Sequence, residues 1–180
     1  APALGRFATH GEDSVVAQQS YLRALQHRHP DRLVMTMGKH SLDSKGTLLP
    51  EYVEGQPYDR TKRVRVWKLE EKQTDVNLAL AMYRDAASQA FQQLVVCSND
   101  SDVEPVLKAI REDFPQIRLG VVTPRMPPEA HRSTGRAVSS SLSQQADWTR
   151  GYLLAAELEA SQMPNRVQTG KKPISKPSHW

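Results

Sequence analysis

The spacing of apolar residues predicts an alternation of helices and strands along most of the chain. Apolar positions three or four residues apart, the period of an amphipathic helix, predict helices over residues 14–28, 74–91, 103–113 and 150–162. Short apolar or alternating runs predict strands over residues 33–37, 64–68, 94–97 and 117–122. The run at 94–97 does not alternate, which is typical of a strand that is buried on both faces.

Strands that alternate with helices predict an α/β fold with a parallel sheet. Two stretches interrupt the alternation. Residues 38–63 form a long connection rich in Gly, Pro and charge, and residues 125–143 are rich in Pro, Ser and Arg. We therefore expect one domain over residues 1–124. A loop, a helix and a basic tail over residues 125–180 are expected to pack on that same domain.

Composition adds a broad class and a cellular location to this picture. The 180 residues are 38% hydrophobic, and no apolar run reaches the roughly 18 residues that a membrane span needs. No signal peptide opens the chain, so a cytoplasmic location is expected. The net charge of +4 permits contact with a nucleic acid without demonstrating it. The one cysteine, Cys97, lies in an apolar run and is expected to be a small buried hydrophobic residue.

Three acidic residues are the strongest chemical signal in the sequence. Asp75 lies at the start of a predicted helix, and Asp100 and Asp102 follow the apolar strand at 94–97. Open α/β sheets bind ligands at the carboxyl ends of their strands, so these carboxylates are expected to meet at one edge. Such oxygen ligands suit Mg²⁺, which could activate water for phosphodiester cleavage. The alternative is plain capping, with Asp102 as the N-cap of the helix at 103–113.

Two segments that contain these acids resemble a known family. Residues 68–79, Lys-Leu-Glu-Glu-Lys-Gln-Thr-Asp-Val-Asn-Leu-Ala, precede residues 94–102, Leu-Val-Val-Cys-Ser-Asn-Asp-Ser-Asp. Together they resemble the NYN domain, a branch of the PIN-like nuclease superfamily. The pattern of that family is Glu-Lys-Gly-x-Asp-Val, a helix, and an apolar strand that ends in Ser-Gly/Asn-Asp-Ser-Asp. The similarity continues through Glu104-Pro105 to the C-terminal tail and covers most of the chain.

The resemblance implies a three-layer PIN-like (Rossmannoid) fold, with a mostly parallel sheet, helices on both faces and a C-terminal extension. It also implies a metal-dependent ribonuclease. In that enzyme Asp75, Asp100 and Asp102 would hold Mg²⁺ or Mn²⁺ and cleave RNA, with single-stranded RNA as the expected partner. The residues expected to contact the nucleic acid are Lys72, Asn99, Ser101, Arg125 and Lys171.

The chain departs from the family pattern in two places. Gln73 stands where the family has Gly, and no segment matches the family's first strand, which ends in an Asp. We expect a second copy or a partner chain to complete the sheet. Whether the chain is an active enzyme stays open at this point. The alternatives are a catalytically impaired module that binds RNA or a protein, and a phosphohydrolase of small molecules.

Overall fold

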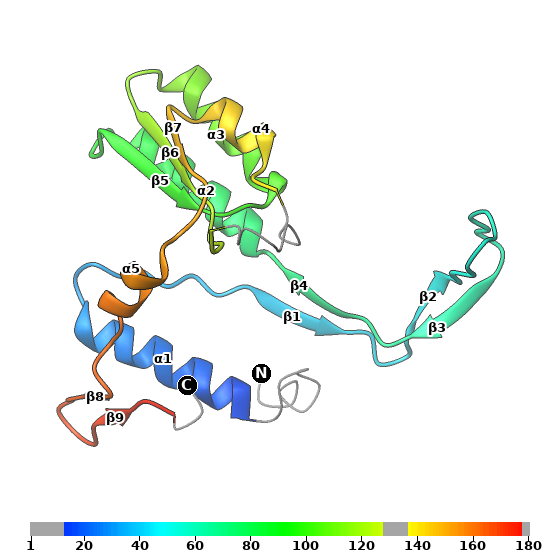
Figure 1. Ribbon diagram of the computed structural model, residues 1–180, viewed down its shortest axis with the longest axis horizontal. Coiled ribbons are helices and arrows are strands. Elements are labelled where there is room, and N and C mark those ends of the chain that lie inside the picture. The colour runs from blue at the N-terminus through cyan, green and yellow to red at the C-terminus, as the bar shows by residue number, and fades with distance from the viewer. Residues whose placement is uncertain (1–12, 128–136, 178–180) are drawn as a thin grey trace.

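The computed structural model describes residues 13–127 and 137–177, and Figure 1 shows that they form three parts. A parallel sheet with its helices forms the first part, and a two-stranded arm reaches away from it. A long N-terminal helix and the C-terminal segment form the third part. The predicted site residues Asp75, Asp100 and Asp102 all belong to the first part.

The first part is built on three parallel strands in the order β5 (Gln93–Cys97), β6 (Arg118–Val122) and β7 (Trp148–Arg150). Three helices accompany them: α2 (Thr74–Ala87), α3 (Glu104–Asp113) and α4 (Ser140–Gln145). A 3-10 helix, η2 (Ser101–Val103), leads from β5 into α3. The sequence predicted α2, α3, β5 and β6 to within a few residues of their ends.

The hydrophobic core lies on one face of this sheet. Successive side chains of a strand point to opposite faces, and Val96, Leu119 and Val121 share the face that packs on the helices. They meet buried side chains from all three helices: Met82, Ala86, Val106, Leu107, Ile110 and Leu142. The three helices therefore cover the same face of the sheet.

Over the described residues no helix covers the opposite face of the sheet, which we call the open face, so the predicted three-layer PIN-like fold with helices on both faces is wrong. Val95 is 48% exposed and Cys97 is exposed, although both were expected to be buried. The remaining described strands form small antiparallel pairs, so the prediction of a mostly parallel sheet is wrong as well. The apolar run at 94–97 misleads because β5 is an edge strand, and an edge strand with one covered face can carry the same residues as a central one.

Trp148 covers the centre of the open face. Its indole lies over Gly120 on the neighbouring strand, and its Nε1 donates a hydrogen bond to Oε1 of Gln93 on β5, 3.1 Å away. A methyl group added to Gly120 would lie only 2.3 Å from Cζ2 of the indole. Glycine at this position therefore leaves room for a ring that joins all three strands.

Four short strands form the arm as two nested antiparallel pairs. β1 (Lys39–Leu42) pairs with β4 (Leu69–Lys72), and β2 (Thr47–Pro50) pairs with β3 (Arg63–Val66) farther out. Each strand packs chiefly on its partner, and Figure 1 shows the arm extending away from the sheet.

The arm was predicted only in part from the sequence. The strand expected at 33–37 is irregular, and the connection expected at 38–63 holds β1 and β2. Strand β3 was predicted from its alternating residues, as the strand at 64–68. Both faces of the arm are largely exposed, so β1, β2 and β4 lack the regular apolar alternation from which a half-buried strand is predicted.

The arm exposes many apolar side chains. Eight large apolar or aromatic residues on it are at least 36% exposed: Leu48, Leu49, Tyr52, Val53, Tyr58, Val64, Trp67 and Leu69. An isolated two-stranded hairpin is only marginally stable in water. The exposed side chains show that no layer covers the arm within the part of the chain that the structure describes.

The third part joins the two ends of the described chain. Helix α1 (Asp13–Arg28) packs against β8 (Arg166–Val167) and β9 (Ile174–Ser175), which pair antiparallel. The helix predicted at 150–162 is shorter in the structure, where α5 covers Ala155–Ala160. None of the described helices has the length and apolar character to cross a bilayer.

We expect Gly120→Ala to lower the free energy of unfolding by about 1–3 kcal/mol, because the added methyl group overpacks the space under the indole. In a Trp148→Ala background the same change should cost much less. Denaturant unfolding of the four proteins of this double-mutant cycle measures the coupling. Equal costs in both backgrounds would show that Trp148 does not fill the space above Gly120.

Candidate functional site

The carboxyl ends of the parallel strands form one edge of the sheet. Cys97 ends β5 and Val122 ends β6, and the two residues are paired in register. The chain continues from them into the turn at Ser98 and into Thr123, while α2 begins next to η2. This is the edge at which open α/β sheets bind ligands. It is the candidate site, and we call it the carboxyl edge.

Hydrogen bonds within the turn fix the backbone after β5. The N–H of Asp100 donates to Oγ of Ser98 at 3.0 Å, and the N–H of Asp102 donates to Oδ1 of Asp100 at 3.1 Å. Asp100 is therefore the N-cap of η2, a role like the one that the sequence suggested for Asp102. Asp102 lies in the first turn of η2, and both acidic residues are exposed.

Asn99 connects this turn to the segment before α4. Its Nδ2 donates a hydrogen bond to the carbonyl of Ala137 at 2.9 Å, and its Oδ1 accepts one from the N–H of Ser139 at 2.8 Å. Both ends of the amide are thus engaged within the chain. Asn99 holds two segments together that lie about forty residues apart in the sequence.

Thr123 is a buried polar residue at the same edge. It is 1% exposed, and its Oγ1 has no hydrogen-bond partner within the described part of the chain. Its N–H donates to the carbonyl of Arg150 at 2.8 Å, which ties the end of β6 to the end of β7. Buried hydroxyls nearly always have a partner, so this one marks a place where a bound molecule can provide it.

Thr123 was not among the site residues predicted from the sequence. A threonine after the apolar residues of β6 resembles one more strand residue, because threonine itself favours strands. The signal available was its position, one residue beyond the strand predicted at 117–122 and therefore at the sheet edge where the acidic residues after 94–97 were expected. Only the structure shows that the hydroxyl is buried and unsatisfied.

The three predicted metal ligands do not form a metal site. Asp75 is exposed in the first turn of α2. Over residues 13–127 and 137–177, no three His, Cys, Asp or Glu side chains are grouped closely enough to hold an ion. The predicted Mg²⁺ or Mn²⁺ cofactor is therefore wrong, because such a cation needs several oxygen ligands that converge. Exposed carboxylates on an open edge reduce their mutual repulsion by staying apart.

The remaining predicted contact residues are spread over the molecule. Lys72 ends β4, and its Nζ lies 2.6 Å from Oε2 of Glu70, which also pairs with Lys68. Ser101 opens η2, Arg125 follows β6, and Lys171 lies between β8 and β9 in the third part. Single-stranded RNA as a partner stays a prediction.

Gln73 precedes α2 in a strained conformation. Its φ of 77° lies in the left-handed region, which costs a residue with a side chain about 1–3 kcal/mol. This is the position at which the NYN pattern has Gly. The chain therefore bears local strain directly before Thr74 and Asp75.

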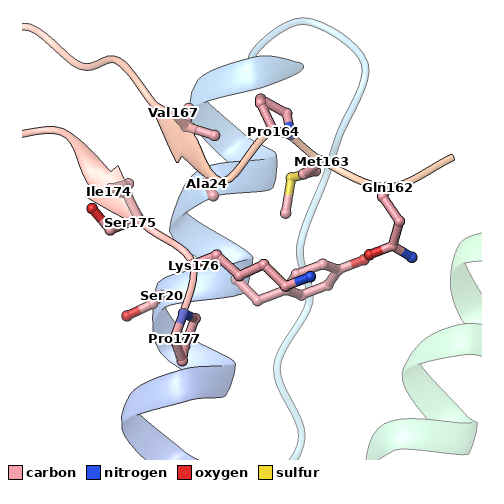
Figure 2. A pocket seen from close by; sticks show the side chains of 11 residues that line it. Ser20, Ala24, Gln162, Met163, Pro164, Val167, Ile174, Ser175, Lys176 and Pro177 are labelled. Atoms are coloured by element: carbon pink, nitrogen blue, oxygen red, sulfur yellow. The ribbon is translucent and has the colours of Figure 1, made fainter. Parts of the chain in front are cut away.

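A small pocket in the third part is too small to be the site (Figure 2). It lies between α1 and the C-terminal segment, and Figure 2 shows Ala24 on one side and Met163, Pro164 and Val167 on the other. Its volume of about 60 Å³ has room for only a few water molecules. Ligand pockets are several times larger, so this pocket is not the candidate site.

Most of this chain is similar to part of a named enzyme. It is 34% identical over 170 residues to 6-hydroxy-3-succinoylpyridine 3-monooxygenase HspA of Pseudomonas putida (strain DSM 28022 / S16). The match covers 93% of this chain and 52% of that enzyme, so the chain spans about half the length of this relative. No family model matches the chain, and no solved structure matches it.

This similarity overturns the functional prediction. The relative is named as a monooxygenase, which is an oxidoreductase, so the predicted metal-dependent ribonuclease, and with it the hydrolase class, is wrong. The alternative, a catalytically impaired binding module, was placed on the PIN-like fold, so it is wrong together with that fold. Acidic residues at the carboxyl edge misled the prediction because capping of η2 and ligation of a cation favour the same side chains.

We expect Asn99→Ala to lower the free energy of unfolding by about 1–3 kcal/mol, because the N–H of Ser139 and the carbonyl of Ala137 lose their partner. Amide exchange at Ser139 should become faster. Ser101→Ala is the control, since its hydroxyl has no partner in the described chain, and it should change neither quantity. Unchanged amide exchange at Ser139 in the Asn99 variant would show that Asn99 does not hold the segment before α4 in place.

The arm should show a pH dependence of known sign. Hydrogen bonds and charge from Lys68 and Lys72 lower the pKa of Glu70 from 4.5 to about 2. A carboxyl with a lowered folded-state pKa stabilises the fold above its unfolded pKa, and this contribution is lost as the pH falls through the folded one. We expect an NMR titration of Glu70 to give a midpoint near 2, and Lys68→Ala to raise it. Lys45→Ala should leave the midpoint of Glu70 unchanged. A wild-type midpoint near 4.5 would show that the two lysines do not lower the pKa of Glu70.

Proposed function

We propose that this chain takes part in a monooxygenase reaction on an aromatic nitrogen heterocycle, with the substrate bound at the carboxyl edge. The observation that carries the proposal is the 34% identity, over 93% of the chain, to an enzyme named for such a reaction. Because the chain spans about half of that enzyme, the proposal concerns a contribution to the reaction.

The polar groups of the carboxyl edge support this placement. A hydroxypyridine ring has hydrogen-bond donors and acceptors around its rim and two apolar faces. Oγ1 of Thr123 is able both to donate and to accept, and the exposed carboxylate of Asp100 is able to accept from a ring hydroxyl or N–H. Binding sites for small molecules combine a few such polar groups with apolar walls, and the half-buried Val122 at the end of β6 is placed to offer one.

The chemistry divides between these side chains and a redox group. A monooxygenase puts one atom of O₂ into its substrate and reduces the other to water with two electrons from a reductant. Activation of O₂ is the task of a redox cofactor rather than of side chains. Asp100 and Thr123 would hold and orient the ring, and a hydrogen bond from the ring hydroxyl to Asp100 would make the ring richer in electrons.

Three expectations from the sequence remain beside this proposal. Membership of the NYN family stays a prediction, since no family model matches the chain. Single-stranded RNA and a cytoplasmic location stay predictions as well. None of them carries the argument for substrate binding at the carboxyl edge.

Binding of 6-hydroxy-3-succinoylpyridine to the purified chain tests the proposal. We expect saturable binding by calorimetry, and Thr123→Val should weaken it about tenfold, because it keeps the shape of the side chain and removes the hydroxyl. Thr149→Val, on an exposed position of β7, is the matched control and should leave the affinity unchanged. Absence of saturable binding would refute the placement.

Oxygen transfer is then measured under isotopically labelled O₂ with NADH or NADPH and added redox cofactors. Mass spectrometry should find one labelled oxygen in the product, and reductant should be consumed only with substrate present. Binding without any labelled product would assign the chain a substrate-binding role alone.

A further inference from the structure

One strand of the arm is strongly basic. Five of the nine residues from 60 to 68 are Arg or Lys, and none is acidic. Within the described residues, only Lys68 of these five forms an ion pair, with Glu70. The other four cations lie on β3 and the turn before it, and they are exposed. Concentrated positive charge of this kind attracts a negatively charged surface.

The carboxyl edge has the opposite character. Asp75, Asp100 and Asp102 are exposed, and none of them forms an ion pair in the part of the chain that the structure describes. The open face of the sheet adjoins them, with Val95 and Cys97 exposed on β5. The first part thus presents acidic groups next to uncovered apolar surface.

The basic strand cannot reach the carboxyl edge of its own chain. Nine residue steps separate Arg63 from Lys72 at the root of the arm, which at about 3.3 Å per residue is roughly 30 Å. Figure 1 shows that the arm runs away from the sheet over this length. Any contact between the two surfaces is therefore made between molecules.

We propose that the arm docks on a second copy of this chain, with its basic strand against the partner copy's carboxyl edge. A second copy is favoured over an unrelated partner because one chain carries both complementary surfaces. A twofold axis lets each copy donate its arm and receive the other, so the assembly closes as a dimer. The exposed Tyr52, Tyr58 and Trp67 of each arm then meet the apolar surface next to the acidic residues.

This assembly removes two unfavourable features at once. The arm gains a covering layer, without which a two-stranded hairpin is marginal. The four cations gain the carboxylates of Asp75 and Asp102 as partners of opposite charge, which favours one orientation and speeds association. Since these groups are exposed, salt should weaken the dimer.

Light scattering after size exclusion tests the proposal. We expect the wild type to have twice the chain mass of 20.2 kDa and to shift toward the monomer as salt is added. Lys62→Glu with Arg63→Glu should raise the dissociation constant at least about tenfold. Lys171→Glu with Lys172→Glu changes the net charge equally but lies in the third part, so it should leave the constant unchanged. Far-UV circular dichroism confirms that each variant is folded.

Charge exchange separates a direct contact from an indirect effect. Asp75→Lys with Asp102→Lys should also weaken the dimer, and all four substitutions combined should restore it to within about threefold of the wild type. A wild type that is monomeric at every concentration overturns the proposal, as does a fourfold variant without recovery. If the arm variant keeps its mass and instead loses retention of single-stranded RNA, the basic strand is a nucleic-acid surface and the dimer is refuted.

Discussion

Burial of one face of a three-stranded parallel sheet is the interaction on which the rest of this structure depends. Leu107 and Ile110 of α3 and Val121 of β6 are fully buried, and α2 and α4 complete the layer around them. The carboxyl ends of parallel strands lie at the same edge of the sheet, so the chain leaves every strand at that edge. The same packing that forms the core therefore places the turn after β5 and the residue after β6 side by side.

Order at the carboxyl edge comes from polar contacts laid over this core. Asp100 caps η2, Asn99 holds the segment before α4, and the backbone of Thr123 links β6 to β7. Among the buried side-chain polar atoms of the described residues, only Oγ1 of Thr123 has no hydrogen-bond partner, which makes this hydroxyl informative. A rigid frame with one unmet hydrogen bond is suited to hold a small polar molecule in a defined orientation.

The sequence predicted those elements in which burial is dense. Helices α2 and α3 and strands β5 and β6 carry apolar residues at regular spacing because each packs on the core, so their periodicity is visible. Strands β1, β2 and β4 of the arm were missed because they are solvated on both sides, whereas β3 was predicted as the strand at 64–68. The single covered face of the sheet was missed because β5 is as apolar as a central strand. The positions of the acidic residues in the sequence suit both roles, because spacing does not distinguish an N-cap from a metal ligand. The burial of Thr123 and the left-handed backbone at Gln73 depend on tertiary structure, which no local pattern reveals.

The nested pairing of the arm has a consequence for how it forms. The segment that joins β2 to β3 is shorter than the one that joins β1 to β4, so closing the inner pair first costs less chain entropy. Once that pair is closed, β1 and β4 meet with little further cost. We therefore expect the arm to form from its tip toward the sheet. The connection between β2 and β3 then sets the register of β1 and β4, and with it the position of Glu70 between two lysines.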